Sequence, residues 1–141
     1  MVDERAFPFA PKSAGELRVG DLIAVPIPDG TWGCLLVINL RLSGPGARTS
    51  LWVSPLSWHG VTQPTAERVE GAAQGEQAMT RMELFHQGGL EVTGHDSSTR
   101  PRRLAGPDDL TVGASHLVWG WRSAIRHGVE AAMAIEVATR H

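Results

Sequence analysis

The sequence is poor in cysteine and lacks an excess of charge of either sign. Its single cysteine, Cys34, excludes an internal disulfide framework and any cysteine-based zinc cluster. Its 13 basic and 15 acidic residues give a net charge of -2, so no strong field attracts nucleic acid or an anionic membrane. We therefore expect no nucleic-acid partner, no metal and no cofactor.

Long hydrophobic runs are also absent. The longest one, Cys34 to Ile38, falls far short of the roughly 20 apolar residues that span a bilayer. The first residues, which include Asp3, Glu4 and Arg5, lack the apolar core of a secretory signal. Together with the single cysteine, these absences predict a cytoplasmic protein without a membrane anchor.

The composition is that of a folded domain. Of the 141 residues, 42% are hydrophobic and 20% are charged, which is typical of a chain with a packed core. Pro8 and Pro11 disfavour helix near the start, so we predict an extended N-terminal arm over residues 1–16 and one globular domain over 17–141. Phe7 and Phe9 either fasten this arm to the domain or belong to a frayed terminus.

Residues 21–40 carry the strongest local signal, which is that of a β-hairpin. Two apolar, β-branched runs flank Pro28, Asp29 and Gly30, residue types that favour a tight turn. Apolar residues occupy both parities of the second run, so its strand should be covered on both faces, by a barrel or by a packed helix.

Further strands and one long helix follow. Periodicity and turn residues predict a third strand over 50–54 and a loop over 62–83 with a helical turn from Thr65 to Val69. They also predict a second hairpin of 82–85 with 90–93. Leu117, Trp121, Ile125, Val129 and Ala132 recur at helical spacing. The fold class is therefore α+β: mainly an antiparallel β meander or small barrel, with a C-terminal amphipathic α-helix.

Residue patterns typical of catalysis are absent from the sequence. The six histidines include no pair at helical i, i+4 spacing, although three of them could converge in space with Asp96. Cys34 lies in an apolar run, which predicts a buried and unreactive thiol. Ser57 and Ser123 lie in no nucleophile elbow, and Gly20 with Asp21 forms no phosphate-binding fingerprint. We assign no catalytic residue.

Tryptophan is the unusual component, because a chain without tyrosine contains five of them. Trp32, Trp52 and Trp121 are expected in the core by strand or helix parity. Trp58 follows Pro55, which ends the third strand, so we predict that it is an exposed anchor for a partner. We add its neighbour His59, and Arg102 and Arg103 as a polar rim, to this predicted partner-binding site.

The segment from Val19 to Gly33 resembles the opening of the immunity protein 26 family of bacterial polymorphic-toxin systems. The shared features are a Gly-Asp pair, an apolar run with proline, and an Asp-Gly turn followed by an aromatic-Gly pair, here Gly20-Asp21, Pro26, Asp29-Gly30 and Trp32-Gly33. The resemblance covers 15 of the 141 residues. It implies that the protein neutralises a cognate toxin by direct binding, without catalysis.

Two functional classes remain open on the sequence. The first is a protein-binding module, an immunity protein among its examples, whose partner is another protein. The alternative is a small enzyme or ligand-binding domain, with a pocket formed by dispersed His, Asp and Arg residues. A binding module should expose an aromatic patch, whereas an enzyme should gather polar groups in a concave pocket.

The hairpin prediction can be tested by truncating its second strand. If residues 21–40 form the structural centre, Leu36→Ala should lower the free energy of unfolding by about 2 to 5 kcal/mol. Urea denaturation measures this change, and a loss below about 1 kcal/mol would place the strand at the periphery.

Overall fold

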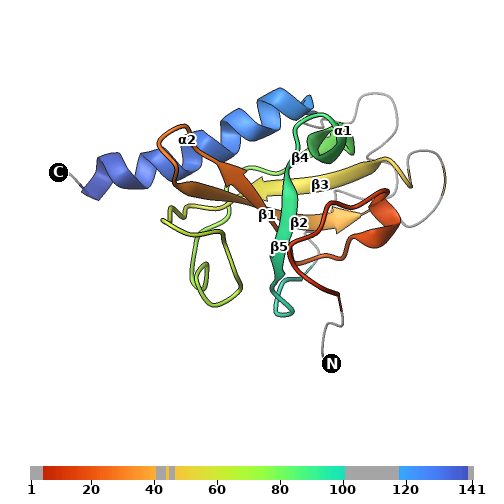
Figure 1. Ribbon diagram of the computed structural model, residues 1–141, viewed down its shortest axis with the longest axis horizontal. Helices are drawn as coiled ribbons and strands as arrows, with labels where there is room; N and C mark the ends of the chain where they lie inside the picture. The colour runs from red at the N-terminus through yellow and green to blue at the C-terminus, as the bar shows by residue number, and fades with distance from the viewer. Residues whose placement is uncertain (1–4, 41–43, 45–46, 101–117, 140–141) are drawn as a thin grey trace.

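The fold is described by a computed structural model over residues 5–40, 44, 47–100 and 118–139. Five strands, one long helix and two short helical turns account for its regular structure (Figure 1). In chain order, these elements are η1 (Ala14–Glu16), β1 (Asp21–Pro26), β2 (Trp32–Leu40), β3 (Ser50–Pro55), β4 (Ala78–Arg81), α1 (Glu83–His86), β5 (Glu91–His95) and α2 (Trp121–Thr139).

The strands form one antiparallel sheet in the order β4-β3-β2-β1-β5. Strands β1 to β3 form the meander that the sequence predicts. β4 extends it and corrects the prediction of a loop over 62–83, and β5 returns to pair with β1. The predicted alternative of a small barrel is wrong, because β4 and β5 lie at opposite edges and do not close the sheet. Isolated bridges flank these edges, from Phe9 to Val92 and from Val118 to Met79.

The predicted hairpin of residues 21–40 is confirmed and forms the centre of the sheet. Its turn is closed by hydrogen bonds from Ile27 N to Thr31 O and from Gly30 N to Ile27 O, both 2.9 Å. Gly30 has a φ of +89°, a conformation that glycine adopts without steric cost. Six consecutive residues of β2 are buried, from Gly33 to Ile38, so the strand is covered on both faces.

Two separate hydrophobic clusters lie on the two faces of the sheet. Leu35 and Val37 point into the first cluster, which also contains residues of α1 and α2. Cys34, Leu36 and Ile38 point into the second, which is closed by residues from the segment 56–77. Figure 1 shows α2 on one side of the sheet and this segment, in yellow-green, on the other.

The predicted second hairpin is wrong: only its second strand is present, as β5, and β5 pairs with β1. Residues 83–86 form the short helix α1, and the strand lies earlier, at 78–81. Neighbouring Leu84 and Phe85 are both buried, which a helical turn at the sheet edge permits and an alternating strand does not. The predicted turn after Thr65 is present, since Val69 N donates to Thr65 O at 3.1 Å.

The C-terminal helix is confirmed as α2, but its buried stripe shares only Ala132 with the predicted one. Over 121–134, the buried positions are small and spaced by four: Ala124, Gly128 and Ala132. The larger residues predicted to form the apolar face, such as Trp121 and Ile125, flank this stripe and are half-buried; Leu117 lies outside the described residues. No helix in the described part of the chain has the length and apolar character needed to cross a membrane.

Small residues allow α2 to approach the sheet closely. A Cβ added at Gly33 in β2 would lie 2.9 Å from the carbonyl oxygen of Gly128 and 3.1 Å from Cβ of Ala132. A Cβ at Gly128 would lie 2.9 Å from Val25 Cγ2. Gly128 lowers helix propensity by about 1 kcal/mol relative to alanine. Its position is explained by this contact, because an added methyl group there would overlap with buried Val25.

Substitution of Gly33 tests the close packing of α2 on β2. We expect Gly33→Ala to lower the free energy of unfolding by about 1 to 3 kcal/mol, because the new methyl group overpacks the interface. Gly15→Ala is the matched control, since its Cβ would meet only Ser13 Oγ at an ordinary 3.5 Å. The control should change stability by about 0.5 kcal/mol or less. Equal effects of the two substitutions in thermal and urea denaturation would contradict the proposed contact.

Candidate functional site

Two of the predicted binding residues, Trp58 and His59, lie where the chain leaves β3. The segment 56–60 runs back beside the β1–β2 hairpin and pairs with the start of β2. Leu56 N donates to Cys34 O at 2.9 Å, Trp32 N donates to Gly60 O at 2.8 Å, and Gly60 N donates to Trp32 O at 3.0 Å. The backbone around Trp58 is therefore fixed to the sheet on both sides of this residue.

Trp58 is half-buried, so it is less exposed than the sequence predicts. Its indole packs against the second hydrophobic cluster and covers Gly60. A Cβ added at Gly60 would lie 2.5 Å from Trp58 Cζ2, so only glycine fits beneath the ring. The indole thus has one stable position, and part of it remains accessible.

His59 and Val61 extend this accessible area. The His59 ring is half-buried, and its Nε2 lies 2.7 Å from the hydroxyl oxygen of Thr31 in the hairpin turn. Val61 is 80% exposed, which makes it the most exposed large hydrophobic residue in the described part of the chain. We call Trp58, His59 and Val61 the Trp58 surface. The predicted rim residues Arg102 and Arg103 lie outside the described residues.

The other tryptophans take different positions. Trp52 is buried, as its parity predicts, whereas Trp32 and Trp121 are only half-buried. Trp119 is also buried, and its ring stacks on His127 with centroids 3.9 Å apart. Core packing thus accounts fully for Trp52 and Trp119.

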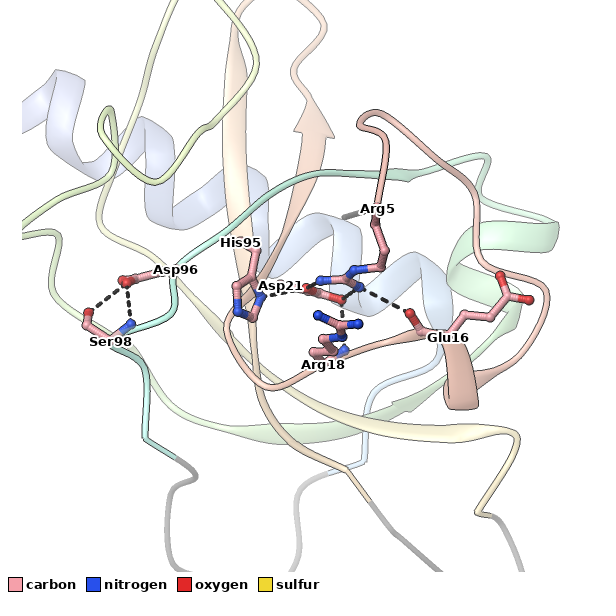
Figure 2. Close-up of polar contacts among 7 residues, drawn as sticks. All are labelled: Arg5, Glu16, Arg18, Asp21, His95, Asp96 and Ser98. Carbon is pink, nitrogen blue, oxygen red and sulfur yellow. Dashed lines mark hydrogen bonds and ion pairs between the residues drawn. The ribbon is translucent and has the colours of Figure 1, made fainter. Parts of the chain in front are cut away.

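A second polar arrangement, which the sequence reasoning missed, is centred on Asp21 at the start of β1. Its side chain is completely buried and accepts four hydrogen bonds (Figure 2). Two come from the Arg5 guanidinium at 2.6 and 2.7 Å, one from Arg18 N at 2.8 Å and one from His95 Nδ1 at 2.9 Å. We call these four residues the Asp21 cluster.

The Asp21 cluster fastens the N-terminal arm to the domain. The Arg5 guanidinium carbon lies 5.5 Å and 5.4 Å from the ring centroids of Phe7 and Phe9, and both rings pack on the first hydrophobic cluster. Phe9 also exchanges backbone hydrogen bonds with Val92 of β5, at 3.0 and 2.8 Å. Of the two alternatives for Phe7 and Phe9, fastening the arm is therefore the correct one.

Gly20, the residue before Asp21, is required where the start of β1 meets the end of β5, a corner that the Asp21 cluster shares. Gly20 has a φ of +103°, and a Cβ there would lie 2.3 Å from the backbone oxygen of Asp96. Asp96 N donates to Gly20 O at 2.8 Å, which joins the start of β1 to the end of β5. The Gly-Asp pair is therefore explained by backbone packing and by a buried charge.

The geometry of the Asp21 cluster supports a structural role. An ionised carboxylate has about four lone-pair positions, and all of them are used here. A buried and saturated carboxylate has no position left for a substrate. His95 donates to Asp21 through Nδ1, and no Ser, Thr or Cys hydroxyl or thiol among the described residues hydrogen-bonds its ring.

The remaining histidines and the cysteine do not gather into a site in the described part of the chain. His86 Nε2 lies 3.2 Å from Pro11 O, and no group of three or more potential metal ligands is found among the described residues. The alternative in which three histidines converge with Asp96 is not seen there. Burial raises the pKa of the Cys34 thiol far above its usual range, so the thiol stays protonated, as the sequence predicts.

Comparison with protein-family models, curated proteins and solved structures finds no match to this chain. The resemblance of residues 19–33 to the immunity protein 26 family thus remains a prediction from sequence.

Removing the Asp21 charge tests the structural role of its cluster. We expect Asp21→Asn to lower the free energy of unfolding by about 3 to 5 kcal/mol, because the buried partners of the carboxylate lose their counter-charge. Asp96→Asn is the control at the same corner, since that carboxylate accepts only local hydrogen bonds from Ser98. It should cost about 1 kcal/mol or less. Similar denaturation midpoints for wild type and Asp21→Asn would refute the assignment.

Proposed function

We propose that this domain acts by binding another protein through the Trp58 surface. The observation that carries the proposal is the 80% exposure of Val61, three residues along the chain from a half-buried tryptophan whose ring lies over Gly60. Trp is the residue type most enriched among binding hot spots, and apolar side chains exposed beside it supply contact area. A surface that combines the two is typical of a protein-binding site.

Anchoring of the segment 56–77 supports this proposal. Besides the pairing of Gly60 with Trp32, Thr93 Oγ1 donates to Pro64 O at 2.7 Å, and Gly75 N donates to Pro55 O at 2.8 Å. The segment is thus attached to three strands of the sheet. Because it is ordered before any partner arrives, binding costs less conformational entropy than it would for a free loop.

The resemblance to immunity proteins names a class of partner, a cognate bacterial toxin that is neutralised by direct binding. Gly20 and Asp21, which belong to the resembling segment, are explained by the fold of this corner. Because the family's opening segment also has a Gly-Asp pair, the resemblance supports a hairpin of the same kind in both. The proposal that the partner is a toxin rests on the resemblance of the whole segment. We propose Arg102 and Arg103 as the polar rim of the binding site.

The alternative of a small enzyme or ligand-binding domain has weaker support. His95, Asp21 and Arg5 do come together from distant parts of the sequence, as that alternative requires. However, the carboxylate at their centre is buried and saturated, so it offers no acid, base or nucleophile to a substrate. A hollow of about 390 Å³ lies beside Arg5, Phe9 and Arg18 and is open to solvent.

Truncation of Trp58 tests the proposed binding role. The products of the neighbouring genes are co-expressed with the protein, and binding of the co-purified partner is measured by calorimetry. We expect Trp58→Ala to weaken binding by 2 kcal/mol or more, about 30-fold, because it removes the central anchor. Thermal denaturation of the same variant reports its loss of stability.

Met79→Ala separates binding from stability. Met79 packs on the same hydrophobic cluster from β4, so its truncation should lower stability similarly. It should leave affinity unchanged, since Met79 is outside the Trp58 surface. If both variants lose affinity in proportion to their stability, or if Trp58→Ala binds like wild type, Trp58 is a core residue and the proposed function is wrong.

A further inference from the structure

A chain of three polar side chains reaches the Trp58 surface from the hairpin turn. Thr31 donates to the Asp29 carboxylate twice, from its backbone N at 2.9 Å and from its hydroxyl. The same hydroxyl oxygen lies 2.7 Å from His59 Nε2. The hydrogen bonds therefore connect Asp29 to Thr31 and Thr31 to His59, which is the sequence neighbour of Trp58.

The chemistry of this chain fixes the tautomer of His59. A carboxylate only accepts hydrogen bonds, so the single hydroxyl proton of Thr31 is directed to Asp29. The hydroxyl oxygen can then only accept from His59, which places the ring proton on Nε2. A neutral imidazole has one donor and one acceptor nitrogen, so Nδ1 carries the lone pair. Nδ1 has no hydrogen-bond partner among the described residues.

The charge near His59 is negative, so it attracts the same kind of group, a cation, as the lone pair on Nδ1. The hydrogen bonds from the Thr31 hydroxyl and backbone N–H hold the pKa of the Asp29 carboxyl below its usual value, so the carboxylate stays negative. In the segment 56–77, three exposed glutamates outnumber the single exposed arginine, Arg68. The Trp58 surface thus combines apolar side chains with the lone pair of His59 and the nearby negative charge of Asp29.

We propose that the Trp58 surface recognises a protein segment that carries a lysine or arginine next to an apolar side chain. The cation donates a hydrogen bond to Nδ1 of His59, and the apolar side chain lies against Trp58 and Val61. A charged donor fits because it complements both the acceptor nitrogen and the Asp29 charge. This inference rests on the proposed function and names the chemistry of the partner.

The tautomer is tested first, by ¹⁵N NMR of the imidazole nitrogens in the full chain. We expect wild type and Thr31→Ser to show His59 with its proton on Nε2, and Thr31→Val to lose this preference. Thr31→Val keeps the shape of the side chain, and its backbone N–H still donates to Asp29. The substitution therefore removes only the hydroxyl group. Wild type with the proton on Nδ1 would overturn the inference.

The recognition chemistry is tested with a phage library of random 12-residue peptides, selected on the full chain. We expect the enriched peptides to carry Lys or Arg beside Leu, Phe or Trp, and to lose binding to Trp58→Ala. Asp29→Asn and His59→Phe should each weaken these peptides at least tenfold. Glu130→Gln, which removes an exposed charge from α2, should change their affinity less than twofold.

The two proposals fail in different ways in this selection. Peptides that require Trp58 but lack basic residues, or that bind Asp29→Asn and His59→Phe like wild type, would overturn the inference and leave the proposed function standing. Enriched peptides that bind Trp58→Ala as tightly as wild type would overturn the proposed function itself, because their contact then lies elsewhere.

Discussion

The buried carboxylate of Asp21 is the interaction on which the arrangement of the fold depends most. A charge removed from water is tolerated only when it is paired and its lone pairs are filled. The four donors that fill them come from the arm, the turn before β1 and strand β5, so one side chain joins three separate parts of the chain. The edge of the sheet and the N-terminal arm are thereby held by one carboxylate.

At the other end of the hairpin, beside its turn, backbone hydrogen bonds hold the segment after β3 in place. Gly60 pairs with Trp32, and this contact places the Trp58 indole over a residue with no side chain. The result is an aromatic ring held at the surface, in the same short segment as exposed Val61. A binding surface built on a rigid scaffold needs little ordering when a partner arrives. The histidine between these residues adds polar specificity to an otherwise apolar contact.

Glycine illustrates how packing overrides local propensity in this protein. Gly128 weakens α2 as an isolated helix, yet its missing side chain lets the helix lie against Val25 and Gly33. For the same reason, the buried stripe of α2 consists of small residues. Its larger residues lie at the sides of the contact, where there is space for them. Periodicity of large apolar residues located the helix but misjudged which of its positions are most buried.

The sequence by itself determined the central hairpin, the meander, the C-terminal helix and the buried thiol of Cys34, because each follows from local pattern and turn chemistry. Only the tertiary structure decided that the sheet stays open, that residues 83–86 are helical, and that Trp58 is half-buried. It also brought Arg5 and His95 to Asp21. Contacts between residues 16 and 74 positions apart in the chain leave no periodic signal, since they depend on how the strands are ordered in the sheet.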